Sequence, residues 1–171
     1  MDRRGRRSVP HLTGFDALYR EHAAHVLRFA LYLCGDRSEA EDLTSETFVR
    51  AWAAPESVRM ATVKGYLFAI TRNLYLQGLR RTGRRVALPR DLREPRPGPD
   101  VEAERSSELQ AALADLQRLP EGERAALVLR AVEDLSYEEI ARALGITLAA
   151  AKVRIHRARL ALARLREART P

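Results

Sequence analysis

The segment 136–165 constrains the fold of this chain more than any other part of the sequence. Ser136 and Glu139 have the Ser-x-x-Glu spacing of a capping box, in which each side chain bonds the backbone amide of the other residue at the start of a helix. Gly145 follows where a left-handed residue ends such a helix, and Thr147 can cap a second, longer helix. Two helices joined by so short a turn predict a helix-turn-helix that binds duplex DNA.

The helix expected after Thr147 separates into an apolar face and a basic one. Its inward positions, at helical spacing, are Leu148, Ala151, Ile155, Ala158 and Leu162. Its outer face and flank carry small and basic residues that suit a major groove, namely Ala150, Lys152, Val153, Arg154, His156 and Arg157. We expect Arg154 and Arg157 to reach base edges or nearby phosphates. Ala150 and Val153 are placed for thymine methyl groups. We expect Lys152 and His156 to hold the DNA backbone.

The overall charge agrees with a polyanionic partner. The chain has 171 residues and a formal net charge of +7, which favours nucleic acid or an anionic surface. Its single cysteine, Cys34, allows no disulfide framework, so we expect a small core residue in a protein of the reducing cytoplasm. No apolar run is long enough to span a membrane. The four histidines have no cysteine or carboxylate cluster beside them, and no phosphate loop or nucleophile motif occurs, so we expect no metal, no cofactor and no enzyme activity.

The order of helical and Pro-rich segments predicts an all-α protein of two small helical domains. Residues 1–13 form a basic arm that we expect to be disordered, and residues 14–82 form the first domain. Residues 83–105 contain four of the eight prolines and predict a flexible linker, after which the second domain occupies 106–169. The expected helices span residues 15–34, 36–52, 64–81, 109–119, 123–132 and 137–144, with a last one from 148 onward.

The helix at 36–52 carries an acidic stripe on a basic protein. Glu39, Asp42 and Glu46 lie on one face, opposite a core face that includes Thr47 and Phe48. An acidic surface would repel DNA phosphates, so its functional interpretation is a docking site for a basic partner protein. A merely solvated helix face is the alternative that these residues leave open.

The helix at 64–81 mixes aromatic residues with arginines. This combination suits single-stranded nucleic acid, because rings stack on unpaired bases while guanidinium groups hold the backbone. The candidate residues are Tyr66, Arg72, Asn73, Tyr75, Arg80 and Arg81. The alternative is that the aromatic rings belong to the core, and for Phe68 we prefer it.

Four stretches in order resemble a known family. They are DRSEAEDLTSETFVRAW, VKGYLFAITRNLYLQGLRR, LPEGERAALVLR and LSYEEIARALGITLAAAKVRIHRAR, the second and third separated by the Pro-rich segment. From Phe15 to Arg166 the chain resembles the extracytoplasmic-function sigma factors of bacterial RNA polymerase. The resemblance implies two domains, sigma regions 2 and 4, that bind core polymerase and direct it to promoters, under the control of an anti-sigma factor that can hold the protein at the membrane.

The resemblance also implies roles for the surfaces already described. Asp42, Ser45 and Glu46 would bind core polymerase, although many relatives have Gln in place of Ser45. The helix at 64–81 would melt and capture the −10 element, and the last helix would bind the −35 element. Relatives often carry hydroxyl residues where this chain has Ala150 and Val153, so promoter preference is expected to differ there. One rival interpretation is a stand-alone helix-turn-helix regulator, which leaves the acidic stripe and the aromatic–arginine helix unexplained. The other is an architectural protein, which would bind DNA without sequence preference.

Overall fold

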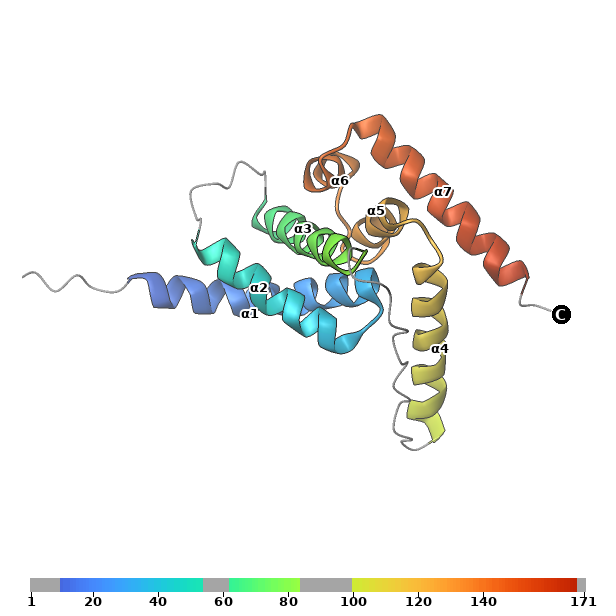
Figure 1. Ribbon diagram of the computed structural model, residues 1–171, viewed down its shortest axis with the longest axis horizontal. Coiled ribbons are helices and arrows are strands. Elements are labelled where there is room, and N and C mark those ends of the chain that lie inside the picture. Colours follow the sequence, from blue (N-terminus) through green and yellow to red (C-terminus); the bar gives the residue numbers. More distant parts are fainter. Residues whose placement is uncertain (1–9, 54–61, 84–99, 169–171) are drawn as a thin grey trace, which may run out of the picture.

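The computed structural model describes residues 10–53, 62–83 and 100–168, which are almost entirely helical. The helices are α1 (Pro10–Cys34), α2 (Arg37–Ala53), α3 (Val63–Gly83), α4 (Asp100–Gln117), α5 (Glu121–Ala131), α6 (Tyr137–Leu144) and α7 (Leu148–Glu167). No strand occurs in these ranges, which agrees with the predicted all-α class. Among the described helices, none is both long and apolar enough to cross a membrane. In Figure 1, α1–α3 (blue to green) lie beside α5–α7 (orange to red).

The first half is a bundle of α1, α2 and α3 around aromatic side chains. Phe29 of α1 and Phe68 of α3 are fully buried, with ring centroids 4.9 Å apart, so the core role expected for Phe68 is confirmed. Thr47 and Thr71 join α2 to α3 through hydroxyl oxygens 3.1 Å apart. Each hydroxyl also lies within hydrogen-bond distance of the carbonyl four residues earlier in its own helix, so the single proton of each has an acceptor without any charged group.

The second half contains the predicted helix-turn-helix. The capping box of α6 is complete: the Ser136 amide donates to Glu139 at 2.8 Å, and the Glu139 amide donates to the Ser136 hydroxyl at 3.2 Å. Gly145 ends α6 in the left-handed region with φ 62°, and the Thr147 hydroxyl accepts from the amide of Ala150 at 3.1 Å. These local hydrogen bonds fix the turn and the angle at which α7 leaves it.

Two helices begin five or more residues earlier than the sequence predicted. α1 begins at Pro10, inside the expected arm 1–13, because proline is well tolerated in the first turn of a helix. α4 begins at Asp100, inside the expected linker 83–105, because good helix formers follow with neither glycine nor proline as far as 117. The other residues of the predicted arm, 1–9, and of the linker, 84–99, lie outside the described residues.

The two halves pack against each other. In the first half, α1 contacts α4 and α5 of the second half, and α3 contacts α6. The buried apolar residues of both halves form one continuous cluster, from Val26 and Phe29 to Ile140 and Ile155. The sequence predicted two tethered domains, and the structure shows both of them with a shared interface.

Candidate nucleic-acid and protein interfaces

The acidic face of α2 points outward. Asp42, Ser45 and Glu46 are all exposed, at positions that share one side of the helix. Glu46 accepts a hydrogen bond from Arg50 at 2.8 Å, one turn further on. The Ser45 hydroxyl donates to the carbonyl of Glu41 at 3.0 Å. An intrahelical ion pair this exposed is weak, so both carboxylates remain available to a basic partner.

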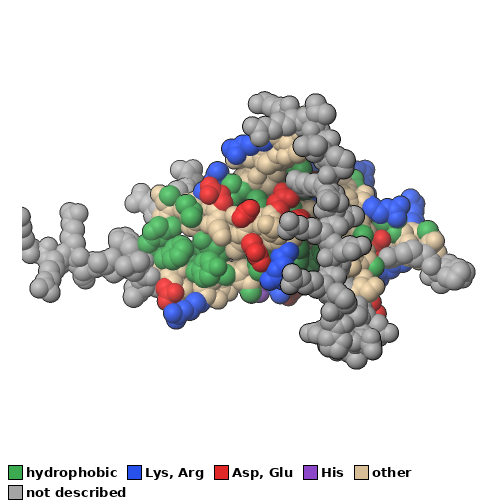
Figure 2. Space-filling view, turned by 60° about the horizontal axis from the view of Figure 1, so that its bottom comes forward, with side chains coloured by type: hydrophobic (Ala, Val, Ile, Leu, Met, Phe, Trp, Pro, Cys, Tyr) green, Lys and Arg blue, Asp and Glu red, His purple; other side chains and the backbone are tan. Residues whose placement is uncertain are grey.

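Exposed hydrophobic side chains adjoin this acidic face. Val49 is 60% exposed, Tyr19 43% and Trp52 38%. Val49 lies one turn beyond Glu46 on the same side of α2. Figure 2 shows acidic side chains next to a group of hydrophobic ones on one face of the molecule. This apolar part was not predicted from the sequence, although Val49 follows Asp42 by seven residues, a spacing that places both on one helix face.

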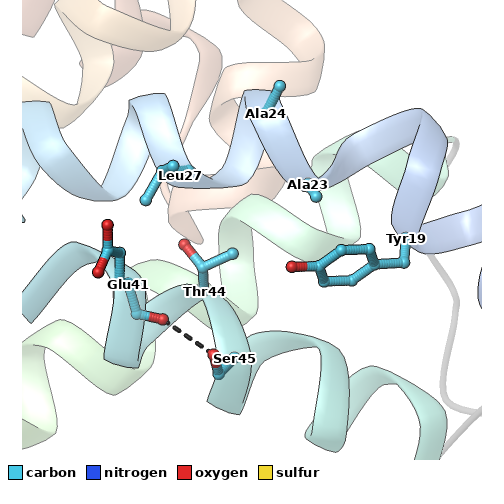
Figure 3. Close-up of a pocket in the computed structure, with 7 residues that line it drawn as sticks. All are labelled: Tyr19, Ala23, Ala24, Leu27, Glu41, Thr44 and Ser45. Atoms are coloured by element: carbon cyan, nitrogen blue, oxygen red, sulfur yellow. Dashed lines mark hydrogen bonds between the residues drawn. The ribbon is translucent and has the colours of Figure 1, made fainter.

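A shallow groove runs between α1 and α2 beside the acidic face. It has a volume of about 190 Å³ and is lined by Tyr19, Ala23, Ala24, Leu27, Glu41, Thr44 and Ser45. Figure 3 shows the Tyr19 ring at one end and the Glu41 carboxylate at the other, with the Ser45 hydroxyl turned to its own helix. The small side chains of Ala23 and Ala24 in α1 keep this groove open. The surface beside the acidic face of α2 is therefore concave rather than flat.

The six candidate residues on α3 do not lie together on one open face. Asn73, Arg80 and Arg81 are exposed, and Tyr66 is half-buried. Arg72 and Tyr75 are directed instead into the interface with the second half. The assignment of the six residues to DNA binding stays a prediction. In this arrangement only the exposed ones, Asn73, Arg80 and Arg81, are open to contact with DNA.

Arg72 and Tyr75 each contact a residue of α5. Arg72 makes a two-pronged ion pair with Glu121, with nitrogen–oxygen distances of 2.7 and 2.8 Å. The Tyr75 hydroxyl accepts from the guanidinium of Arg124 at 3.1 Å, and burial raises the pKa of that hydroxyl. No role was predicted for Glu121 or Arg124, because each lies 49 positions from its partner in the sequence.

The candidate DNA-binding face of α7 is largely open. Lys152, Val153, His156 and Arg157 are exposed, and Ala150 is half-buried. They follow the capped first turn of α7, so their backbone positions are fixed.

Arg154 differs from its neighbours on this face because it is half-buried. Its guanidinium lies over α5, where a Cβ at Gly122 would come within 2.5 Å of Nη1. Gly122 therefore leaves the space that Arg154 occupies. The inward position predicted for Leu148 is wrong, since this side chain is 38% exposed. It is the first residue of α7, at the edge of the helix-turn-helix.

Comparison with known proteins matches both halves to sigma regions. The family model "Sigma-70 region 2" matches residues 18–85, and "Sigma-70, region 4" matches residues 109–162. The chain is 34% identical over 150 residues to the ECF RNA polymerase sigma factor SigL of Mycobacterium tuberculosis, covering 85% of each protein. The chain belongs to the extracytoplasmic-function sigma factors. This sigma factor is also 42% identical over 156 residues to SigE of Mycolicibacterium smegmatis, covering 86% of its own length and 60% of that protein.

Solved structures of sigma factors match this sigma factor across both regions. One is the sigma factor RpoE of Bartonella quintana in complex with the anti-sigma factor NepR, at 27% identity and a TM-score of 0.76, covering 91% of this chain and 98% of that one. Another is CnrH in complex with the cytosolic domain of CnrY, at 27% identity and a TM-score of 0.72, covering 93% and 91%. Each superposition includes regions 2 and 4 together.

Proposed function

We propose that this sigma factor binds core RNA polymerase and directs it to specific promoters. The α2 face docks on the polymerase, α7 binds the −35 element as duplex, and α3 holds the melted −10 strand. One observation carries the proposal: an exposed acidic and apolar docking face and a basic helix-turn-helix occur in one chain of net charge +7. Sigma factors are generally not catalytic, so the polymerase performs the chemistry.

Transcription in vitro tests the proposal as a whole. Core polymerase supplied with this chain should start RNA at discrete promoter positions on genomic DNA, and core polymerase alone should not. If the chain bound such DNA but left initiation unchanged, it would be a stand-alone regulator. Equal affinity for random and promoter DNA at physiological salt would identify an architectural protein instead.

The docking role of α2 is tested by reversing its charge. Asp42→Arg with Glu46→Arg should weaken affinity for core polymerase about tenfold or more. The introduced arginines would repel a basic partner, and like charges that face each other across an interface cost several kcal/mol. The control is Glu21→Arg with Glu138→Arg, which changes the net charge equally at two exposed positions outside α2. Affinity measured by fluorescence anisotropy should fall only for the first pair. An equal loss in both would mean that total charge, not this face, governs binding.

The DNA-binding role of α7 is tested by comparing its two arginines. Arg157→Ala should cost about 1–3 kcal/mol and relax preference at one base pair if the side chain contacts a base. Arg154→Ala tests the same role for the half-buried arginine over Gly122. Selection of −35 sequences by each holoenzyme gives the result. A uniform loss across all sequences assigns that arginine to a phosphate.

We propose further that an anti-sigma factor controls this protein, by analogy with the relative crystallised with NepR. Regions 2 and 4 of this chain are arranged as in that relative, which supports the analogy.

A further inference from the structure

One buried carboxylate joins region 4 to region 2. The Glu133 side chain, just after α5, is 0% exposed. Three basic side chains of region 2 surround it: its oxygens lie 2.7 Å from Arg28 Nε, 2.7 Å from His25 Nδ1 and 3.0 Å from Lys64 Nζ. Lys64 also donates to the Glu133 carbonyl at 3.1 Å. The carboxylate thus has its basic partners in the other region of the chain.

A second set of contacts joins α3 to region 4. Arg72, in addition to its pair with Glu121, donates to the carbonyl of Leu144 at the end of α6, at 3.3 Å. Arg124 is 4% exposed, and besides Tyr75 it donates to the last carbonyls of α4. The guanidinium of Arg72 therefore contacts two helices of region 4, α5 and α6. The hydroxyl of Tyr75 contacts α5 as well, through Arg124.

These contacts are of a kind that water can replace. A carboxylate without exposure is stable only when it is paired, and separation of the regions would return Glu133 to water. Its partners are already partly hydrated, at 38% exposure for the His25 side chain, 41% for Arg28 and 28% for Lys64. Interfaces between domains that include such polar contacts open more readily than wholly apolar ones, and here the ion pairs accompany the apolar cluster that the two halves share. Glu133 and Glu121 each pair with basic side chains of region 2 across this interface.

The closed arrangement covers part of α3 and leaves the other candidate surfaces open. Arg72 and Tyr75 are used in contacts to region 4, whereas the α2 face and most of the α7 face are exposed. We infer that Glu133 and Glu121 form a latch that holds regions 2 and 4 closed in the free protein and withholds the −10 face of α3 from single-stranded DNA. The inference rests on the proposed role of α3 in −10 binding. Opening is then a required step before the melted strand binds.

The test uses the full chain with Glu121→Gln and Glu133→Gln. Its matched control is Glu21→Gln with Glu138→Gln, two exposed carboxylates that take no part in the interface. Small-angle X-ray scattering should give a larger radius of gyration for the latch variant than for the control or the unaltered protein. Affinity for a fluorescein-labelled pool of random 20-nucleotide single strands should rise about tenfold or more over the control, because apparent affinity is reduced by the fraction of molecules that are closed.

Each outcome decides the inference. An unchanged radius of gyration overturns the latch, and a larger radius with the affinity of the control overturns the masking of α3. If the latch variant loses helical circular dichroism, Glu121→Arg alone, which should also open the chain, replaces it. Adding Arg72→Glu should then restore the compact radius, and a radius that stays compact in Glu121→Arg overturns the latch. Failure of the proposed function is seen separately, as absence of promoter-specific transcription by the unaltered holoenzyme.

Discussion

The ion pair between Arg72 and Glu121 allows the strength of the interface between the regions to be measured. The perturbation is a double-mutant cycle of Arg72→Ala, Glu121→Ala and the two together. The side chains are 13% and 18% exposed, and their two hydrogen bonds are 2.7 and 2.8 Å long. Exposed pairs contribute about 0.2–1 kcal/mol, and charge-assisted hydrogen bonds in protected sites about 1.5–3 kcal/mol. After a discount for desolvation, we expect a coupling energy of about 2 kcal/mol.

The cycle removes contributions that do not belong to the pair. Glu121 begins α5, where a carboxylate gains about 0.3–1 kcal/mol from the helix dipole whether or not Arg72 is present. Arg72→Ala also removes the hydrogen bond to the Leu144 carbonyl in both backgrounds. Both contributions therefore cancel in the coupling energy, although they enlarge the effect of each single substitution.

Urea unfolding of the full chain, followed by circular dichroism, supplies the four free energies of unfolding. The control cycle is Arg37 with Glu41, an exposed pair within α2 whose side chains are 78% and 54% accessible. That pair should couple by about 0.3–0.5 kcal/mol. If Arg72 and Glu121 couple no more strongly than the control, this ion pair does not hold the two regions together and the latch is refuted.

Three further predictions concern stability and reactivity. Burial would raise the pKa of Glu133, but hydrogen bonds from its three basic neighbours lower it below the ordinary value of 4.5, and the Ser136 amide lowers that of Glu139. The stability that both contribute is thus present above about pH 4.5 and lost as the pH falls further, which melting temperatures between pH 3 and pH 7 would show. Gly78→Ala should stabilise by about 1 kcal/mol in urea, since an added Cβ meets nothing within 4 Å, whereas Gly145→Ala, at φ +62°, should destabilise by about as much. Burial raises the pKa of Cys34 to about 11, so iodoacetamide at pH 8 should alkylate it at least about tenfold more slowly than a cysteine peptide, as mass spectrometry can follow.

The sequence predicted features whose cause lies within a few residues. The Ser136 and Glu139 cap, the Gly145 turn and the bounds of α6 all depend on hydrogen bonds between near neighbours. The buried face of α2 was predicted for the same reason, because helical periodicity alone decides which side chains share a side.

The sequence did not reveal what depends on distant partners. Glu133 lies 105 positions from Arg28, and nothing local distinguishes a buried carboxylate from one in solvent. Arg72 and Tyr75 were assigned to DNA from their chemistry, and that chemistry is used here by region 4. The planar guanidinium group of arginine binds a carboxylate as well as a phosphate. The residue type alone therefore could not show whether Arg72 pairs with Glu121 or with DNA.

The position of the docking face predicts the order in which polymerase and DNA bind. α2 packs on α1 and α3, and Asp42 and Glu46 stay exposed while the two regions are in contact, so core polymerase can dock before the latch opens. Glu121→Gln with Glu133→Gln should therefore leave affinity for core polymerase within about twofold of the unaltered protein, while single-strand affinity rises. Fluorescence anisotropy with labelled protein measures the first quantity. A tenfold gain in core affinity would show that the closed state also covers the docking face and that opening precedes polymerase binding.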